Sequence, residues 1–399
     1  GEVARPLLYS QLAADGIAWT TPQVLAASAL AVDVAGGISN TLHLAYLVGQ
    51  DTPGSPAGVY YRRSGEDGAG WGTPTLVYTS PGLRLLTAED AHLRLAAAAD
   101  GGIYLAWDDP QRQRSLLAIS TDGGVTWGLP VDVGDPEGEL GSRRARPIAP
   151  AGGDVLLVWE PGQAAGSCLL FPAPVAAVLD DPAGLGAGEQ ILETLASCPQ
   201  AERFLALGDG QGLLLAGSGS DALTLALWDG ERWSEPTRWG AGFEDPETGR
   251  AVYLGGLQAV LLQAPLAAAG GPAAGALVAV GTDGAGDVWA TTARGGDLDL
   301  VFAPPPAWSS PAVVSEGEAY PGLPASAIDA QGWLHAVWSE ALAPGEPGTA
   351  LTYARWDGTA WSRPATAPPL QPAGLAPRRP GRSRPAGGGS CRRPRRGRP

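Results

Sequence analysis

A short pattern of tryptophan and proline recurs along the chain and constrains its fold more than any other feature. The pattern Trp-x-x-Pro occurs six times, at intervals of 52, 56, 106, 75 and 53 residues, and 106 is twice 53. Its tryptophans are Trp19, Trp71, Trp127, Trp233, Trp308 and Trp361. Self-similarity at a nearly fixed period predicts a repeat architecture, in which each copy forms one supersecondary unit.

Most copies carry the signature of a β-hairpin. Four of them read Asp-Gly-x-x-Trp-x-x-Pro and begin at Asp15, Asp67, Asp229 and Asp357. Aspartate bonds the backbone of a tight turn and glycine adopts positive φ, so we expect a strand to start at each tryptophan. Proline restricts that strand to the edge of a sheet.

A second element precedes each hairpin, namely a short apolar strand that ends in an aromatic residue. Clear copies span residues 42–46, 103–107, 155–159 and 334–338, and weaker copies span 213–217 and 288–292. Each repeat then holds two inner strands and an outer hairpin, which is the content of one propeller blade. The 58 glycines and 37 prolines among 399 residues agree with many short strands separated by turns.

The repeats predict an all-β, six-bladed β-propeller with four-stranded antiparallel blades. An extra hairpin near residues 7–25 opens the chain without inner strands of its own, so the ring has either six blades or seven with one half missing. We assign residues 1–367 to the propeller and 368–399 to a disordered tail rich in arginine, proline and glycine. The tail is either genuine or the product of a shifted reading frame. The chain begins at Gly1 and contains no methionine, so we expect that it has lost its natural start.

Charge and composition exclude several function classes. All 26 basic residues are arginine, nine of them in 371–399, so residues 1–370 carry 17 − 41 = −24, which argues against nucleic-acid binding. The uncharged run 251–282 is interrupted by Pro265 and Pro272, and it predicts two buried strands rather than a membrane span. Cys168 and Cys198 either form a disulfide or remain buried thiols. We expect no metal and no cofactor, because no Cys/His cluster or phosphate-binding loop is present.

One repeat also carries a motif of a known family. Residues 120–127 match the Ser-x-Asp-x-Gly-x-Thr-Trp Asp-box of the sialidase (neuraminidase) superfamily, also called the BNR repeat, through Ser120, Asp122, Gly124, Thr126 and Trp127. Residues 64–71 are a looser copy, and residues 320–338 and 361–364 are similar to repeats of bacterial sialidase-like propellers. The resemblance covers nearly all of residues 1–367. It implies that the Asp-boxes are structural hairpins on the face away from the active site.

The resemblance further implies a catalytic set of three arginines that bind a carboxylate, a tyrosine nucleophile with a glutamate, and an aspartate acid/base. Arg94, Arg146 and Arg203 lie at corresponding positions before successive inner strands, so neighbouring blades would bring them together at the channel mouth. The alternative is that they form ion pairs with nearby acids and close the channel. The family's Arg-Ile-Pro signature is absent, and Arg146-Pro147-Ile148 has another order.

The remaining candidates are Tyr320 with Glu318 as the nucleophile pair and Asp90 as the acid/base. The alternative for Tyr320 is that its Tyr-Pro pair is repeat punctuation. His43 and His335 occupy a position that other repeats fill with varied bulky residues, so we interpret them as packing residues.

Two functional hypotheses follow. The first is a binding or scaffold module for glycans or extracellular proteins, secreted or at the cell surface of a bacterium with a high-GC genome, and monomeric. The second is an exo-α-sialidase that hydrolyses terminal sialic acids. Neither hypothesis involves nucleic acid, a membrane span, a cofactor or a metal.

Overall fold

The computed structural model describes the following parts of the chain, and the structural statements below concern them alone. They are residues 5–11, 19–52, 54–68, 70–134, 141–149, 155–161, 171–176, 201–206, 212–217, 222–228, 237–240, 242–244, 251–253, 255–261, 277–282, 287–293, 312–315, 320–322, 324–328, 333–343 and 348–367. In several strands, among them all those between residues 201 and 278, only the backbone is described.

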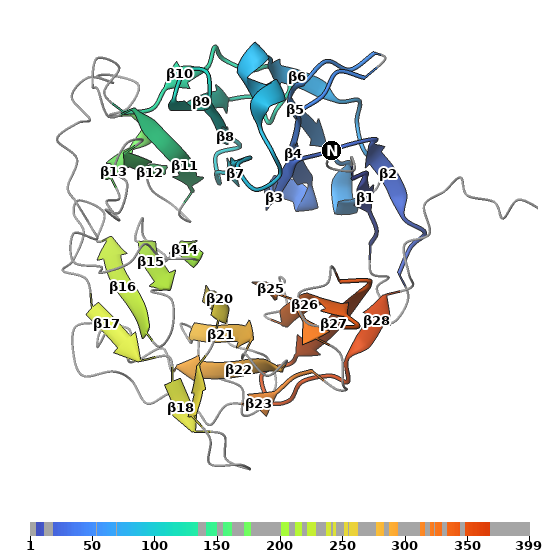
Figure 1. The fold of residues 1–399 in the computed structure, drawn as a ribbon, viewed down its shortest axis with the longest axis vertical. Helices are drawn as coiled ribbons and strands as arrows, with labels where there is room; N and C mark the ends of the chain where they lie inside the picture. The colour runs from blue at the N-terminus through green and yellow to red at the C-terminus, as the bar shows by residue number, and fades with distance from the viewer. Residues whose placement is uncertain are drawn as a thin grey trace, which may run out of the picture. The chain divides into compact units, whose positions relative to one another are not determined.

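Blades one to three are three successive antiparallel sheets (Figure 1). Blade one contains β3 (Ala31–Gly36), β4 (Leu42–Val48), β5 (Gly58–Arg63) and β6 (Thr75–Tyr78). Blade two contains β7 (Leu93–Ala97), β8 (Ile103–Asp109), β9 (Arg114–Ser120) and β10 (Val131–Asp132). Blade three contains β11 (Ser142–Ile148), β12 (Leu156–Pro161) and β13 (Phe171–Pro174).

Blades four to six continue the series. Blade four contains β14 (Ala201–Ala206), β15 (Gly212–Gly217), β16 (Ala222–Trp228) and β17 (Thr237–Gly240). Blade five contains β20 (Gly255–Leu261), β21 (Leu277–Thr282), β22 (Val288–Ala293) and β23 (Ala312–Val313). Blade six contains β24 (Tyr320–Pro321), β25 (Ala325–Ile328), β26 (Leu334–Ala341), β27 (Ala350–Trp356) and β28 (Ala365–Ala367). Two small hairpins complete the fold: β1 (Leu7–Tyr9) with β2 (Gln23–Ala26), and β18 (Gly242–Glu244) with β19 (Ala251–Tyr253).

The sheets follow one another as propeller blades. In most of them the strands pair in chain order, and the first strands of neighbouring blades contact each other, as β3 contacts β7, β7 contacts β11 and β20 contacts β25. The expected all-β propeller of antiparallel blades is therefore confirmed. In the described residues it has six blades and, in addition, the hairpin β1–β2.

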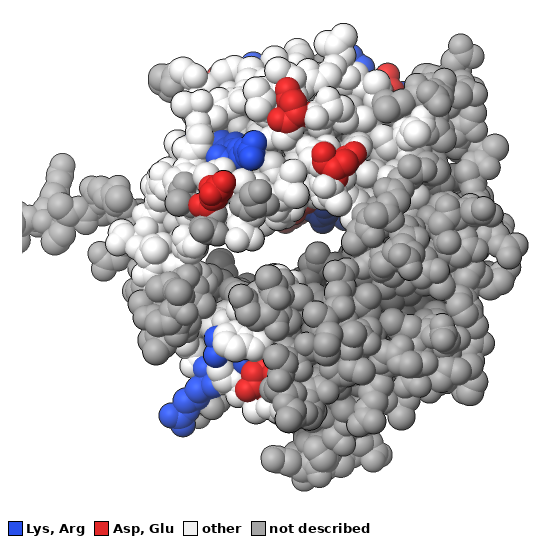
Figure 2. Space-filling model, turned by 180° about the vertical axis from the view of Figure 1, so that it is seen from behind, with Lys and Arg blue, Asp and Glu red and all other residues white. Residues whose placement is uncertain are grey.

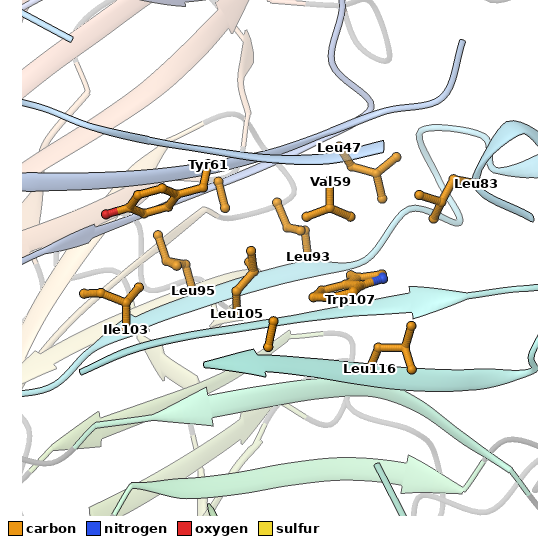
Figure 3. Packing of buried hydrophobic residues seen from close by; sticks show 12 residues of the cluster. Leu47, Val59, Tyr61, Leu83, Leu93, Leu95, Ile103, Leu105, Trp107 and Leu116 are labelled. Atoms are coloured by element: carbon orange, nitrogen blue, oxygen red, sulfur yellow. The ribbon is translucent and has the colours of Figure 1, made fainter. Parts of the chain in front are cut away.

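Aliphatic and aromatic side chains between consecutive blades form the core. Between blades one and two, Leu47, Leu93, Leu105, Trp107 and Leu116 are each 1% exposed or less (Figure 3). Burial of one such side chain contributes about 1.5–3 kcal/mol. Similar clusters lie between blades two and three and between blades five and six. The face-to-face packing of blades is what stabilises this fold.

The Asp-box forms the hairpin between β9 and β10. Asp122 accepts hydrogen bonds from the Thr126 backbone (2.8 Å) and hydroxyl (2.5 Å), and Ser120 Oγ donates to it at 2.7 Å. These bonds lower the pKa of Asp122 to about 2, with the Thr126 hydroxyl as the largest cause. Gly124 has φ of 89° and lies against the Tyr61 ring, so a side chain there is excluded twice.

The Asp-box hairpin closes the boundary between blades one and two through what we call the first His–Tyr–Trp contact. Tyr61 hydrogen-bonds His43 Nδ1 at 2.5 Å, and its ring meets Trp127 edge-on with centroids 5.0 Å apart. A second contact of this kind joins blade six to the N-terminal hairpin. It pairs His335 with Tyr353 at 2.8 Å, and Trp19 lies edge-on to Tyr353 at 6.2 Å.

The second contact places β1–β2 beside blade six as the Asp-box hairpin stands beside blade one. Leu7 and Tyr9 of the hairpin pack on blade one, and Arg62 Nη1 donates to the Leu25 carbonyl at 2.8 Å. Among the described residues β1 pairs with β2 alone. The hairpin is therefore the outer half of a further blade. Of the two blade counts that the sequence left open, the described residues fit six blades together with half of a seventh.

Two other expectations are resolved by the strands of blade five. Residues 251–282 contain β20 and β21, an antiparallel pair, as predicted for the uncharged run. The interpretation of residues 288–292 as an inner strand is wrong, because β21 takes the second position of this sheet and β22 the third. The described residues include no helix long and apolar enough to cross a membrane.

Chain contacts separate residues 1–368 from 369–399. The predicted tail, Cys168 and Cys198 lie outside the described residues. The boundary at residue 367 and the cysteine pairing stay predictions.

Candidate functional site

The three candidate arginines lie on the first strands of three consecutive blades. Arg94 is on β7, Arg146 on β11 and Arg203 on β14, opposite Ala106, Val158 and Leu215 of the second strands. Only the backbone of Arg203 is described. The backbone thus has the order that the carboxylate-binding hypothesis requires.

Two of these arginines act on the same buried imidazole. His92 is 8% exposed, and its Nε2 lies 3.0 Å from the Ala145 carbonyl. Burial, together with the charges of Arg94 and Arg146, lowers the pKa of His92 to about 3. Burial also lowers the pKa of Arg146 to about 10, opposed by Glu160 and reinforced by Arg94. Arg94 and Arg146 lie on β7 and β11, the first strands of blades two and three, which contact each other.

A glutamate that the sequence analysis did not single out holds the arginines of blade three. Glu160, 12% exposed at its side chain, meets Arg143 at 3.1 Å, Arg144 at 3.5 Å and Arg146 at 3.4 Å. The side chain of Arg146 is equally buried, so this pair is screened little by solvent. Ion pairing, the alternative considered for Arg146, thus does occur, with Glu160 rather than with the acids near the start of the strands.

A second acid missed at the sequence level is Asp108. Its Oδ1 accepts hydrogen bonds from Ser115 Oγ at 2.5 Å and from the Arg144 backbone at 2.9 Å. Burial raises the pKa of Asp108 to about 6 although these bonds oppose the shift, and the charge of Glu160 adds to it. Asp108 on β8 and Glu160 on β12 each follow the aromatic residue of the second-strand repeat, Trp107 and Trp159. An acidic residue at this repeat position was the sequence signal that could have identified both residues.

Asp108 opens onto a pocket of about 370 Å³ between the loops of blades two and three. The lining residues are Leu85, Leu86, Asp90, Asp108, Asp109, Pro110, Gln113, Arg114, Gly141, Ser142 and Arg143. Asp90, the predicted acid/base, is among them, and its Oδ2 accepts a hydrogen bond from Thr87 Oγ1 at 2.7 Å. The pocket combines hydrogen-bond acceptors, donors and aliphatic surface in a volume suited to a small polar ligand.

The Asp-box and this pocket lie at opposite ends of blade two. Strand β9 begins at Arg114, in the pocket, and ends at Ser120, the first Asp-box residue. Seven residues in extended conformation span about 20 Å. The Asp-box residues therefore serve the fold at a distance from the candidate site.

The remaining candidates are not gathered at this pocket. Tyr320 lies on β24 of blade six, 39% exposed and paired with Ala341, and Glu318 is outside the described residues. Trp333 is covered by the Arg355 guanidinium, 3.7 Å from its ring centroid. His43 is 2% exposed, in agreement with its interpretation as a packing residue.

Charge is dispersed on the face shown in Figure 2. Its described part is mostly uncharged, with a few separate acidic and basic side chains. Within the described ranges there is no group of three His, Cys, Asp or Glu side chains that could hold a metal ion.

Comparison with known proteins gives similarity of fold. No protein-family model matches the chain, and no curated protein does. Among solved structures, the Aleuria aurantia lectin in complex with Fucα1-6GlcNAc is 14% identical, with 86% of this chain and 97% of the lectin covered and a TM-score of 0.46. The intramolecular trans-sialidase of Ruminococcus gnavus is 11% identical, with coverages of 82% and 93% and a TM-score of 0.47.

A third solved structure, the NanB sialidase of Streptococcus pneumoniae, is 8% identical, with coverages of 77% and 64% and a TM-score of 0.48. At these identities the likeness concerns the fold alone.

Proposed function

We propose that the protein is an extracellular glycan-binding module and that the pocket between blades two and three is its binding site. The observation that carries this proposal is the lining of the pocket, where Asp90, Gln113 and Arg114 surround a space beside Leu85 and Leu86. Sugar hydroxyls both donate and accept hydrogen bonds, so they need acceptors and donors together. The aliphatic side chains complement the C–H face of a sugar ring.

The position of the lining residues supports the same function. They come from strand ends and the loops that connect them, and loops on a rigid scaffold are where binding residues concentrate. The Asp108 carboxyl group loses its proton between about pH 5 and 7, because its pKa is about 6. A carboxyl group of this kind donates a hydrogen bond when protonated and accepts one when ionised. We therefore expect glycan affinity to change in that pH range.

Screening on a glycan array followed by calorimetry with the best ligand tests the proposal. Asp90→Ala is expected to weaken binding about tenfold or more, as loss of one well-placed hydrogen bond to a charged group would do. Asp51→Ala is the matched control, since Asp51 is an exposed acid paired with Arg84 on blade one. Equal affinity of the two variants, or no glycan bound by the unaltered protein, would contradict the proposal.

We propose exo-α-sialidase activity as the second candidate, and the placement of Arg94 and Arg146 on the contacting strands β7 and β11 favours it. In this hypothesis Arg94, Arg146 and Arg203 bind the sialic-acid carboxylate, Tyr320 with Glu318 is the nucleophile pair, and Asp90 is the acid/base. Release of 4-methylumbelliferone from its sialoside would support it. Arg94→Ala should abolish that release, and absence of turnover in the unaltered protein leaves the binding function alone.

A further inference from the structure

The face of blade one that lies toward β1–β2 is covered at β4 and β5 and exposed at β3. On this face Val34 of β3 pairs with Leu44 of β4, and Val32 pairs with Tyr46. Leu44 and Tyr46 are 5% and 3% exposed beneath the hairpin, whereas Val34 and Val32 are 56% and 47% exposed. Burial on this face therefore ends between β3 and β4.

The equivalent positions of blade two are fully packed. Residues 103–107 repeat the pattern of 42–46, so Leu105 corresponds to Leu44 and Trp107 to Tyr46. Their partners on β7 are Leu95 and Leu93, which are 7% and 1% exposed and lie against blade one (Figure 3). Val34 and Val32 are thus in positions that a preceding pair of inner strands would cover.

The hairpin β1–β2 supplies the outer half of that missing blade. Its Trp19 makes the second His–Tyr–Trp contact with blade six, as Trp127 does between blades one and two. In Figure 1, β1 lies on the inner side of β2, and among the described strands it pairs with β2 alone. A strand edge of this kind presents N–H and C=O groups that can pair with another strand.

Blade six carries small exposed residues on the face that meets the hairpin. On β25, Ala325 and Ala327 are exposed, and Ala327 pairs with His335, whose face carries the contact to Trp19 through Tyr353. The exposed faces of Val32 and Val34 and of Ala325 and Ala327, together with the free edge of β1, are called the slot below. It continues inward the interface that the hairpin already makes with blades one and six.

We propose that the slot binds an extended, mostly apolar strand pair of another polypeptide chain, which pairs antiparallel with β1 and completes the half blade. Aliphatic walls select uncharged side chains, because a charge placed there would lose its hydration without a partner. The free edge selects an extended backbone, the recognition mode of β-strand addition. The protein is then a receptor for a peptide segment through a site separate from the pocket of blades two and three.

A synthetic peptide with the sequence of residues 30–48 is a suitable probe. It contains β3 and β4, whose Ala31, Ala35 and Ala45 already pack against Leu93 and Leu95 at the next boundary. Its one carboxylate, at Asp33, accepts a hydrogen bond from the Leu95 backbone at 2.8 Å. The alanines of the bound peptide should contact Val32 and Val34 of the protein as Ala31, Ala35 and Ala45 of blade one contact Leu93 and Leu95.

The experiment measures binding of the fluorescein-labelled peptide to the full chain by anisotropy, with a scrambled peptide as control. We expect saturable binding, slower hydrogen exchange at residues 7–9, and at least tenfold weaker binding by the Val32→Asp/Val34→Asp variant. Leu129→Asp is the matched control, since Leu129 is 92% exposed on the Asp-box side. Val32→Ser/Val34→Ser, expected to weaken binding less, serves if the aspartate variant does not fold.

Three outcomes would overturn the proposal. They are no binding of the peptide, binding that the Val32/Val34 variants leave unchanged, and a dimer of the free protein that these variants dissociate. The last would assign the slot to a second copy of the chain.

Discussion

The two His–Tyr–Trp contacts use the same residue types in the same arrangement but rest on different supports. They comprise His43, Tyr61 and Trp127 in the first and His335, Tyr353 and Trp19 in the second. The first has the shorter His–Tyr bond, 2.5 against 2.8 Å, and the closer rings, 5.0 against 6.2 Å. A complete blade stands behind the first and a two-stranded hairpin behind the second. The comparison indicates that inner strands tighten the contact made by outer ones.

The largest effect is expected from truncating the central tyrosines. Tyr61→Ala should lower the free energy of unfolding by about 3–5 kcal/mol, because the ring is 2% exposed and packed on two blades. Tyr353→Ala should cost about 2–3 kcal/mol, since Trp19 lies farther from that ring than Trp127 lies from Tyr61. Urea unfolding followed by circular dichroism measures both. Equal losses would mean that the missing inner strands do not weaken the second contact.

Removing the tryptophan of the second contact should act locally. Trp19→Ala is expected to cost about 1–2 kcal/mol, the value of an aromatic pair with part of its buried area. Hydrogen exchange should become faster at residues 7–9 and 23–26 and stay unchanged in β4. A uniform increase over the blades would show instead that the hairpin is an integral part of the core.

Acid should weaken the first contact through His43. Burial lowers the pKa of His43 to about 4, and the charge of Arg63 adds to the shift. Since the unfolded imidazole titrates near 6.5, this contribution to stability is complete above pH 6.5 and is lost as the pH falls through 4. His43→Gln should therefore lose less stability than the unaltered protein between pH 7 and 4. Parallel unfolding curves of the two proteins over that range would refute the assignment.

The smallest effect is expected at the turns that hold the hairpins. Asp122→Asn should lower the midpoint of thermal unfolding by a few degrees, because an amide replaces a carboxylate that accepts several hydrogen bonds. Asp357→Asn is the matched control in another repeat, where the pKa is also about 2. It should have less effect, since Asp122 also positions Trp127 against Tyr61. The ionised Asp122 carboxylate contributes to the free energy of unfolding above about pH 4, and this contribution is lost as the pH falls through 2.

The repeats made the blades predictable, and the candidate site was predictable only in part. Apolar strands with a tryptophan or tyrosine marked the second strand of most blades. The error at residues 288–292 arose because β21, the second strand of blade five, has no aromatic residue, whereas β22 contains Trp289. Arg94 and Arg146 were found because they recur at one repeat position. Glu160, on β12, was missed because it meets its three arginine partners on β11 only when the two strands pair.

By itself, the sequence determined the blade, since turn residues and alternating apolar strands are local signals that fix φ, hydrogen bonding and the buried face of each repeat. Only the tertiary structure decided which charges pair, that Asp108 keeps its proton to about pH 6, and that Val32 and Val34 stay exposed while their counterparts in blade two are buried. Those properties depend on what the neighbouring blade brings into contact. Such contacts join residues distant in the chain, and no local pattern encodes them.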